Sequence, residues 1–402
     1  MLTIRYPELL GMVRELTSGL LPLILKDDPI PKLIVKGSKE TILTAKVKQG
    51  FSVYLAPYSF RDVNSLGFVA AFFDNDVHPI TVVGAIMQEY NGEVFRSFLL
   101  GDQVDVYFFD ELNREMLGYR ARLVMSDAYR SALSEARFPS LKDIEQRAVL
   151  DLVTQWFSLT GPLDDERAIS FQFEESLFPE DYVFFDMRAE NNSYKGSPGY
   201  SHTFLEREEP GEFQERDIIS LLQNTFPAEC IYSSPLRTND KEEIVDVMVV
   251  TESNILFVQA KDSPNLEKTI RKTLERKRLT THSALKKAMA QVRGTIGYMR
   301  RSSPMVVLIG GEEESINYEG KNVYSLIVVK ELFDDEFDEY TPKLLDVSHD
   351  TGAPCIALSY SELYQYTAHL RGDEAFFGAF LRVFDHGVRT GMFPRLRLHH
   401  PE

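Results

Sequence analysis

The spacing of the hydrophobic positions changes along the chain and predicts three regions of different structure. Over residues 6–25 the apolar side chains recur at helical spacing, which predicts a leading helix within residues 1–30. Beyond it the period changes to two and β-branched and aromatic residues dominate, which predicts a β-rich domain over residues 31–135. Residues 201–402 alternate between helical and strand patterns, as is typical of an α/β domain.

Two turn signals divide the β-rich domain into hairpins. Asn91-Gly92 lies between two apolar runs, and because both residues tolerate positive φ it predicts a two-residue hairpin turn. A second turn is predicted at residues 111–114, between strands over 104–109 and 116–124. Helical spacing is absent, so residues 42–55 are assigned to strands as well. A small barrel or sandwich of roughly six strands is expected, and no catalytic pattern occurs in it.

Residues 136–200 are expected to connect the two domains. Ser140, followed three residues later by Asp143, predicts the capped start of an amphipathic helix that bridges the domains. Residues 190–201 are rich in Asn, Ser, Gly and Pro, which predicts a linker and places the main boundary there. The predicted fold class is therefore α+β and multi-domain, with an N-terminal β-rich domain and a C-terminal α/β domain.

Composition is that of an ordinary globular protein. Hydrophobic residues make up 44% and charged residues 26% of the 402 residues. The two cysteines, Cys230 and Cys355, lie outside any CxxC or Cys/His motif, which favours a reducing cytoplasm. The N-terminus lacks a signal-peptide pattern and no apolar run approaches the ~20 residues of a membrane span, so we expect a cytoplasmic protein without a membrane partner.

The polar residues of one predicted hairpin are the strongest candidates for chemistry. Two apolar runs, residues 245–250 and 255–261, flank a polar turn. A four-residue turn would place Asp246 opposite Gln259, and a two-residue turn would place it opposite Lys261. Both registers bring the three polar side chains together, whereas a three-residue loop or a bulge would separate them.

Buried polar groups that converge in this way must satisfy one another or hold a ligand. Carboxylate and amide oxygens suit Mg²⁺ or Mn²⁺, with Asp246 and Gln259 as ligands. The preceding helix can add Glu215, which lies on its buried face, and Glu212, about one turn earlier, is the alternative. The simpler interpretation is an ordinary cross-strand hydrogen bond between Asp246 and Gln259, with Lys261 at the surface.

The order of these residues resembles the PD-(D/E)xK nuclease superfamily, and most closely its nuclease-related-domain and Mrr-like branches. The resemblance covers roughly residues 205–301 and implies a restriction-endonuclease-like fold over 201–402 with metal-dependent phosphodiester cleavage. It implies that Asp246, the residue at position 259 and the leading glutamate bind metal, that Lys261 orients water or steadies charge, and that Gln291 assists. The chain departs from the commonest pattern because Gln259 replaces an acid and Val245 stands where proline is usual.

Charge is segregated along the chain. The formal net charge is −17, but residues 268–301 carry eleven basic residues and one acid, so this segment is +10 and the remainder −27. A basic segment beside the candidate site favours contact with phosphates of DNA, or of RNA, whereas a solvated helix face is the simpler interpretation. The predicted nucleic-acid-binding residues are Lys268, Arg271, Lys272, Arg276, Lys277, Arg278, Lys286, Lys287 and Arg293.

The leading hypothesis is a Mg²⁺- or Mn²⁺-dependent endodeoxyribonuclease with its site on the hairpin. Cleavage of both DNA strands by one site per chain would favour a homodimer. The second hypothesis is a catalytically inactive nuclease-like domain that binds nucleic acid or a protein partner. The third is an interaction protein without a role in nucleic-acid binding.

Overall fold

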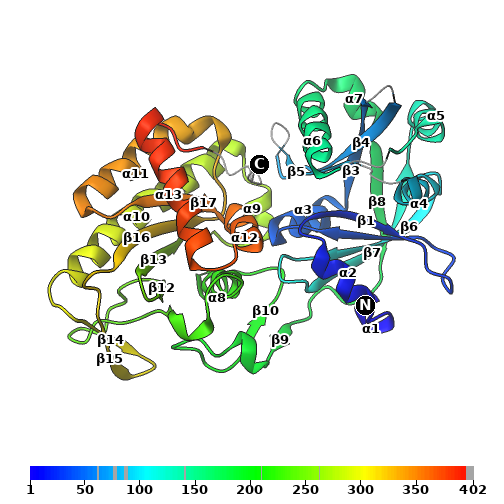
Figure 1. The fold of residues 1–402 in the computed structure, drawn as a ribbon. Coiled ribbons are helices and arrows are strands. Elements are labelled where there is room, and N and C mark those ends of the chain that lie inside the picture. The colour runs from blue at the N-terminus through cyan, green and yellow to red at the C-terminus, as the bar shows by residue number, and fades with distance from the viewer. Residues whose placement is uncertain are drawn as a thin grey trace. The chain divides into compact units, whose positions relative to one another are not determined.

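The structure is a computed structural model that describes residues 1–60, 63–75, 79–85, 89–139, 142–209, 211–261 and 263–394. The chain has a mixed α+β fold and divides into two compact units (Figure 1). Unit 1 comprises residues 1–182, 204–206 and 265–272, and unit 2 comprises residues 183–203, 207–264 and 273–402. Among the described residues, none of the helices combines the length and the apolar composition that a membrane crossing requires.

Unit 1 is built on one eight-stranded sheet with the order β1-β2-β6-β7-β8-β3-β4-β5. The outer strands β1 and β5 approach each other, so the sheet is nearly closed into a barrel. All neighbouring strands are antiparallel except β2 and β6. The strands are β1 Gly19–Leu23, β2 Lys32–Lys36, β3 Gly50–Phe60, β4 Val63–Phe72, β5 Ile80–Ala85, β6 Gln103–Phe109, β7 Glu115–Val124 and β8 Ile169–Ser176.

Helices cover this sheet. The α6 helix packs on β3, β4 and β5, where Val149 and Val153 lie in one core cluster with Tyr54 and Val69. The predicted bridging role of this helix is therefore wrong, because its apolar face is buried within unit 1; Ser140, its predicted cap, lies outside the described residues. The helices are α1 Leu2–Arg5, α2 Leu9–Glu15, α3 Lys39–Lys48, α4 Glu89–Leu99, α5 Asp127–Glu135, α6 Asp143–Ser158, α7 Pro162–Arg167 and α9 Glu267–Ile270.

Several predicted elements of the N-terminal half differ from the structure. The leading helix is two short helices, α1 and α2, and its second half is strand β1, which pairs with β2. The strand predicted around Ile42 is helix α3, whose cap Ser38 accepts a hydrogen bond from the Thr41 amide. The hairpin predicted at Asn91-Gly92 is helix α4, and Gly92 is needed for packing, since a Cβ there would meet the Phe138 ring at 2.1 Å. The hairpin predicted at residues 111–114 is confirmed by β6 and β7.

Unit 2 is built on a five-stranded sheet with the order β11-β12-β13-β16-β17. The first three strands are antiparallel neighbours, and β13, β16 and β17 run parallel. Two hairpins, β9–β10 and β14–β15, form separate two-stranded sheets. The strands are β9 Phe184–Asp186, β10 Ser201–Thr203, β11 Ile231–Ser233, β12 Val247–Val250, β13 Asn254–Lys261, β14 Met305–Ile309, β15 Glu312–Ile316, β16 Asn322–Val329 and β17 Cys355–Ser359.

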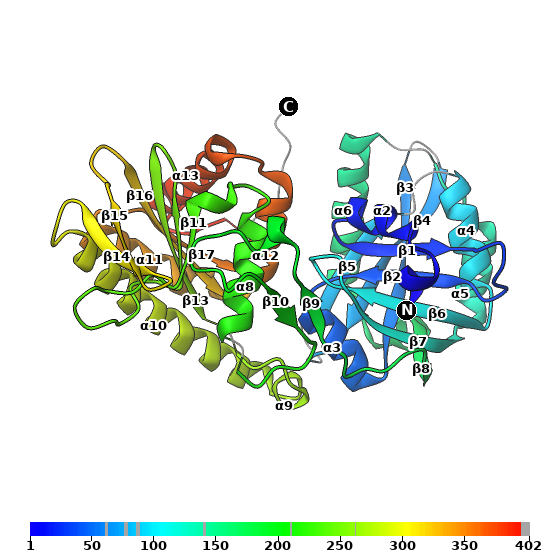
Figure 2. The ribbon, with the colours of Figure 1, turned by 90° about the horizontal axis from the view of Figure 1, so that it is seen from below.

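Helices lie on both faces of the five-stranded sheet. The α10 and α11 helices pack together on one face, and α8 and α12 pack together on the other (Figure 2). The helices are α8 Gly211–Leu222, α10 Leu274–Met299, α11 Phe337–Thr351, α12 Tyr360–His369 and α13 Asp373–Thr390, with short 3₁₀ turns at Ala189–Asn191, Ala228–Cys230 and Asp334–Glu336. The long basic helical stretch predicted over 268–300 is two helices, because helix α9 ends at Ile270 and α10 begins at Leu274. Thr273 caps α10, since its side chain accepts a hydrogen bond from the Arg276 amide.

Two stretches that flank the elements of unit 2 are part of unit 1. Residues 204–206 precede α8, and residues 265–272 follow β13. The side chain of Asn265 joins them, since its Nδ2 donates to the Leu205 carbonyl at 2.6 Å in a buried position.

Replacing Asn265 with Ala should destabilise the protein. The Leu205 carbonyl would stay buried without a donor, which costs about 1–3 kcal/mol. Chemical denaturation of the full chain measures the loss. Asn239→Ala, at an exposed position whose side-chain amide donates to the neighbouring Asp240, is the control and should change stability little. Equal stability of the two variants would contradict the role of Asn265.

Candidate functional site

The β12–β13 hairpin adopts the register expected for a four-residue turn. Val250 pairs with Ile255 and Val247 with Val258, so continuing the ladder by one residue sets Asp246 opposite Gln259. Asp246 itself lies just before β12, where the regular backbone pairing has ended. The first of the two even-loop registers is therefore confirmed.

Beyond the last backbone pair of the hairpin, the side chain of Asp246 accepts the hydrogen bond of a β13 amide. Its Oδ2 accepts from the Ala260 amide at 2.5 Å and lies 3.4 Å from Lys261 Nζ. The residue is only 4% exposed. Burial raises the pKa of Asp246, and the Lys261 ammonium and the Ala260 amide act in the opposite direction. Lys261 lies two residues after Gln259 on β13, and its Nζ approaches Asp246 as the sequence predicted.

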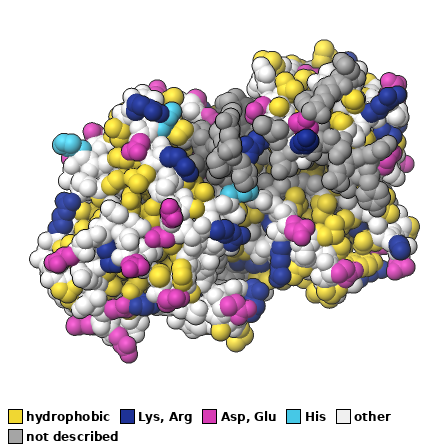
Figure 3. All heavy atoms as spheres, in the orientation of Figure 1, with side chains coloured by type: hydrophobic (Ala, Val, Ile, Leu, Met, Phe, Trp, Pro, Cys, Tyr) yellow, Lys and Arg dark blue, Asp and Glu magenta, His cyan; other side chains and the backbone are white. Residues whose placement is uncertain are grey.

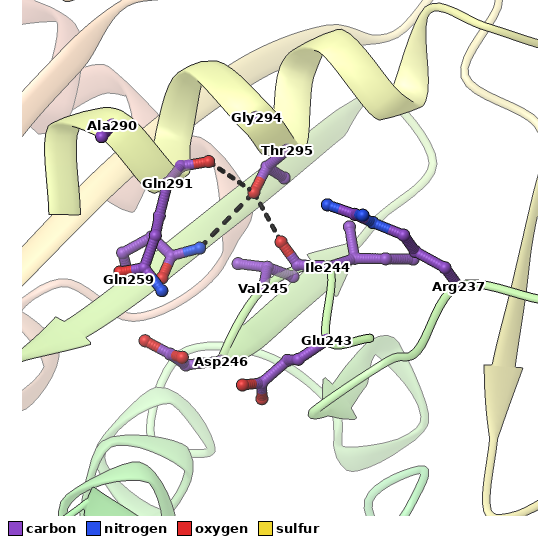
Figure 4. Close-up of a pocket in the computed structure, with 10 residues that line it drawn as sticks. All are labelled: Arg237, Glu243, Ile244, Val245, Asp246, Gln259, Ala290, Gln291, Gly294 and Thr295. Atoms are coloured by element: carbon purple, nitrogen blue, oxygen red, sulfur yellow. Dashed lines mark hydrogen bonds between the residues drawn. The ribbon is translucent and has the colours of Figure 1, made fainter. Parts of the chain in front are cut away.

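Gln259 is held by Thr295 of α10 (Figure 4). The Thr295 hydroxyl has one hydrogen, and both carbonyls near it, those of Ile244 at 2.6 Å and Gln291 at 3.0 Å, can only accept. Toward Gln259 the hydroxyl must therefore act as the acceptor, and the amide nitrogen of Gln259 faces it at 3.4 Å.

The amide oxygen of Gln259 consequently faces away from Thr295. The residue is 1% exposed, and this Oε1 atom is buried with no hydrogen-bond partner among the described residues. A buried carbonyl without a donor is unfavourable by about 1–3 kcal/mol. The position is therefore suited to a ligand that supplies positive charge.

Glu215 lies on α8, which packs on the face of the sheet opposite α10, and it interacts electrostatically with Asp246. Its Oε2 accepts from Ser234 Oγ at 3.2 Å. Burial, together with the charges of Asp246 and Glu243, raises the pKa of Glu215 to about 8. The alternative, Glu212, is exposed and pairs with Arg216 on its own helix, so the structure brings Glu215 rather than Glu212 into electrostatic contact with Asp246.

Glu243 is a site residue that the sequence reasoning missed. It lines the same cavity as Asp246 (Figure 4), and burial and the Asp246 charge raise its pKa. Its position three residues before Asp246 was the available signal, but the predicted strand began at residue 245 and left Glu243 outside it. The segment 243–246 precedes β12 instead, which allows both carboxyl groups to face the cavity.

Glu243, Asp246, Gln259 and Thr295 line a cavity of about 320 Å³ beneath α10 (Figure 4), whereas Glu215 and Lys261 lie outside its lining. Its α10 wall is formed by Ala290, Gln291, Gly294 and Thr295, so the predicted Gln291 does lie at the site. The opposite end carries Arg237, a second residue that sequence reasoning missed. Within the described ranges no three Asp, Glu, His or Cys side chains are arranged to hold a metal on their own.

The predicted basic segment is less uniform than its composition. Lys268, Arg271 and Lys272 belong to unit 1, and the other six predicted residues lie on α10 in unit 2. On α10, Lys277 is buried with 6% exposed, and ion pairs engage Arg278 with Asp335 and Arg293 with Asp350. Acidic side chains distant in sequence therefore neutralise part of the predicted strip.

Lys286 and Lys287 remain the basic residues best placed for the site. They are exposed, and no ion pair engages either one within the described part of the chain. Each lies one helical turn before a cavity residue, Ala290 or Gln291, and so on the same face of α10. Arg276 is also exposed but lies near the start of the helix. On the face shown in Figure 3, basic and acidic side chains are interspersed over both units.

Comparison with known proteins does not add to this description. Neither a protein-family model nor a curated protein sequence matches the chain.

The raised pKa of Glu215 predicts a pH-dependent effect on stability. The folded protein holds a proton on Glu215 up to about pH 8, whereas the unfolded chain releases it near 4.5. Folding stability therefore falls as the pH rises between these values. In metal-free buffer, Glu215→Gln should raise the melting temperature relative to wild type at pH 9 and leave it nearly unchanged at pH 4.

The exposed Glu212 on the same helix provides the control. Glu212→Gln should show no such gain in melting temperature between pH 4 and pH 9. If Glu215→Gln changes the melting temperature equally at both pH values, the carboxyl group does not hold its proton as described.

Proposed function

We propose that the chain is a metal-dependent nuclease that hydrolyses phosphodiester bonds in DNA. The observation that carries the proposal is the buried Oε1 of Gln259, which has no hydrogen-bond partner among the described residues, beside the buried carboxylate of Asp246. Thr295 directs this oxygen away from itself, and a divalent cation is the natural partner for an amide oxygen next to a carboxylate. We therefore assign the site to Mg²⁺ or Mn²⁺.

The order of elements in unit 2 supports a restriction-endonuclease-like core as part of the proposal. Helix α8 is followed by the antiparallel strands β11, β12 and β13, then by α10 and the parallel strand β16. This order agrees with the resemblance to the PD-(D/E)xK superfamily. Glu215 comes from α8, Asp246 from the segment just before β12, and Lys261 from the end of β13.

Asp246 and Gln259 would hold the metal, with Glu215 as a further ligand. Because its pKa is about 8, Glu215 keeps its proton at neutral pH and would release it when a cation binds. Metal affinity should therefore increase between pH 6 and pH 8. When bound, the metal would activate a water molecule and neutralise charge on the phosphate.

The chain's own groups would perform the remaining tasks. Lys261 Nζ, held 3.4 Å from Asp246 Oδ2, places a positive charge where negative charge develops during phosphodiester hydrolysis. Lys286 and Lys287 would bind phosphates next to the cavity. Contacts of this kind give affinity that depends on salt, without sequence preference.

Plasmid and single-stranded DNA incubated with the purified protein and Mg²⁺ or Mn²⁺ should be cleaved. Lys261→Ala and Asp246→Asn should lower the rate by at least about a hundredfold, because each removes a charge that acts on the reacting phosphate. Lys343→Ala, which removes an exposed lysine of α11 paired with Glu339, is the control and should retain activity.

Cleavage that persists in Lys261→Ala or in excess chelator would overturn the assignment. Metal binding and salt-dependent DNA binding without any cleavage would favour the second hypothesis, an inactive nuclease-like domain. The observation that favours this hypothesis is Gln259, which stands where the superfamily pattern usually has an acidic residue.

The hydrogen bond from Gln259 to Thr295 predicts a contrast between two substitutions. Thr295→Val keeps the shape of the side chain but removes the acceptor, so the Gln259 amide loses its fixed orientation. Mn²⁺ affinity measured by calorimetry should fall about tenfold. Thr295→Ser retains the hydroxyl and should bind Mn²⁺ nearly as wild type. Equal Mn²⁺ affinity of both variants, with both folded by circular dichroism, would contradict this role for Thr295.

A further inference from the structure

The far end of the cavity carries an arginine with unused hydrogen-bond donors. Arg237 donates through Nη1 to Glu242 at 3.0 Å and to Asp240 at 3.4 Å. Its Nε is buried and has no partner among the described residues, and no hydrogen bond from Nη2 occurs in the same part of the chain. Nε and Nη2 form the side-on edge of the guanidinium, which is the geometry that binds two phosphate oxygens at once.

This edge lies beside the α10 helix. The Arg237 Cζ is 5.6 Å from the centre of the Tyr298 ring, and Tyr298 is one helical turn after Gly294. Figure 4 shows the side chain extending toward α10 on the side of Thr295. The Tyr298 ring packs against the guanidinium, and the Nε–Nη2 edge has no hydrogen-bond partner among the described residues.

Gly294 leaves open space on this wall of the cavity. A Cβ at Gly294 would meet no described atom within 4 Å, so the packing of the protein does not require glycine there. Glycine is also unfavourable in a helix interior. The open surface of Gly294 therefore allows a ligand to approach the helix closely. The same cavity is lined by Arg237 and Gln259, whose Nε and Oε1 atoms have no hydrogen-bond partner among the described residues.

We propose that Arg237 and the open surface of Gly294 form a phosphate seat for the nucleic-acid strand. The seat binds a second phosphate of the strand whose scissile phosphate lies at Asp246 and Gln259. The proposal rests on the proposed function in one respect, that the ligand is nucleic acid. Arg237 is a substrate-binding residue in this arrangement and takes no part in holding the metal.

Binding of a fluorescein-labelled single-stranded oligonucleotide in EDTA, over a series of salt concentrations, tests the seat. Arg237→Gln should weaken binding about tenfold and lower the slope of log affinity against log salt by about 0.7, because one phosphate contact is lost. Arg237→Lys keeps the charge but lacks the two-donor edge, so it should weaken binding with the slope preserved.

Gly297 provides a matched control for Gly294. Both are exposed residues inside α10 where an added Cβ would meet no described atom within 4 Å, but only Gly294 lines the cavity. Alanine at either position should raise the melting temperature. Gly294→Ala should weaken oligonucleotide binding several-fold, whereas Gly297→Ala should bind as wild type.

The outcomes separate this proposal from the nuclease assignment. Wild-type affinity and salt slope in Arg237→Gln, or equal oligonucleotide affinity in the two alanine variants, overturns the seat even if the protein binds Mn²⁺ and cleaves DNA. Loss of oligonucleotide affinity in Arg237→Gln and Gly294→Ala supports the seat even if no metal-dependent cleavage is found.

Discussion

The hydroxyl of Thr295 is the group on which the arrangement of the candidate site depends. Its single hydrogen is committed to backbone carbonyls, so it can only accept from Gln259, and the Gln259 oxygen must then face away from it. On the facing strand, the Ala260 amide donates to Asp246 just before the start of β12. Two hydrogen bonds therefore place a carboxylate and an unpaired amide oxygen at one wall of a cavity.

Electrostatics divides this cavity into two ends. Burial raises the pKa of Glu215, Glu243 and Asp246, and the charge of Asp246 raises the pKa of Glu215 and of Glu243 further. The ionised form of these carboxyl groups is therefore unfavourable unless a proton or a cation binds to them. Arg237 lies at the other end, beside Tyr298, whereas Lys286 and Lys287 lie one helical turn before Ala290 and Gln291 on α10. A divalent cation suits the acidic end, and the phosphodiester backbone of a nucleic acid suits the end that carries Arg237. This is the physical basis for proposing nucleic acid as the ligand.

The hairpin at the site was predictable because its register follows from a polar turn of fixed length between two apolar runs. Thr295 and Arg237 were not, since nothing local to either residue signals a contact with Gln259 or a cavity wall. The Asn91-Gly92 turn was predicted wrongly because packing of Gly92 against Phe138 outweighs its local preference. The basic segment looked stronger in sequence because the acids that neutralise it, such as Asp350 beside Arg293, are 57 residues away.

Crystals soaked in Mn²⁺ test the central claim most directly, because anomalous scattering locates the ion without reference to activity. The account predicts one Mn²⁺ bound by a carboxylate oxygen of Asp246 and by Gln259 Oε1, at about 2.2 Å from each, with Glu215 within reach. An empty site at saturating Mn²⁺, or an ion bound to Asp246 while the Gln259 oxygen is turned away toward Thr295, would contradict it.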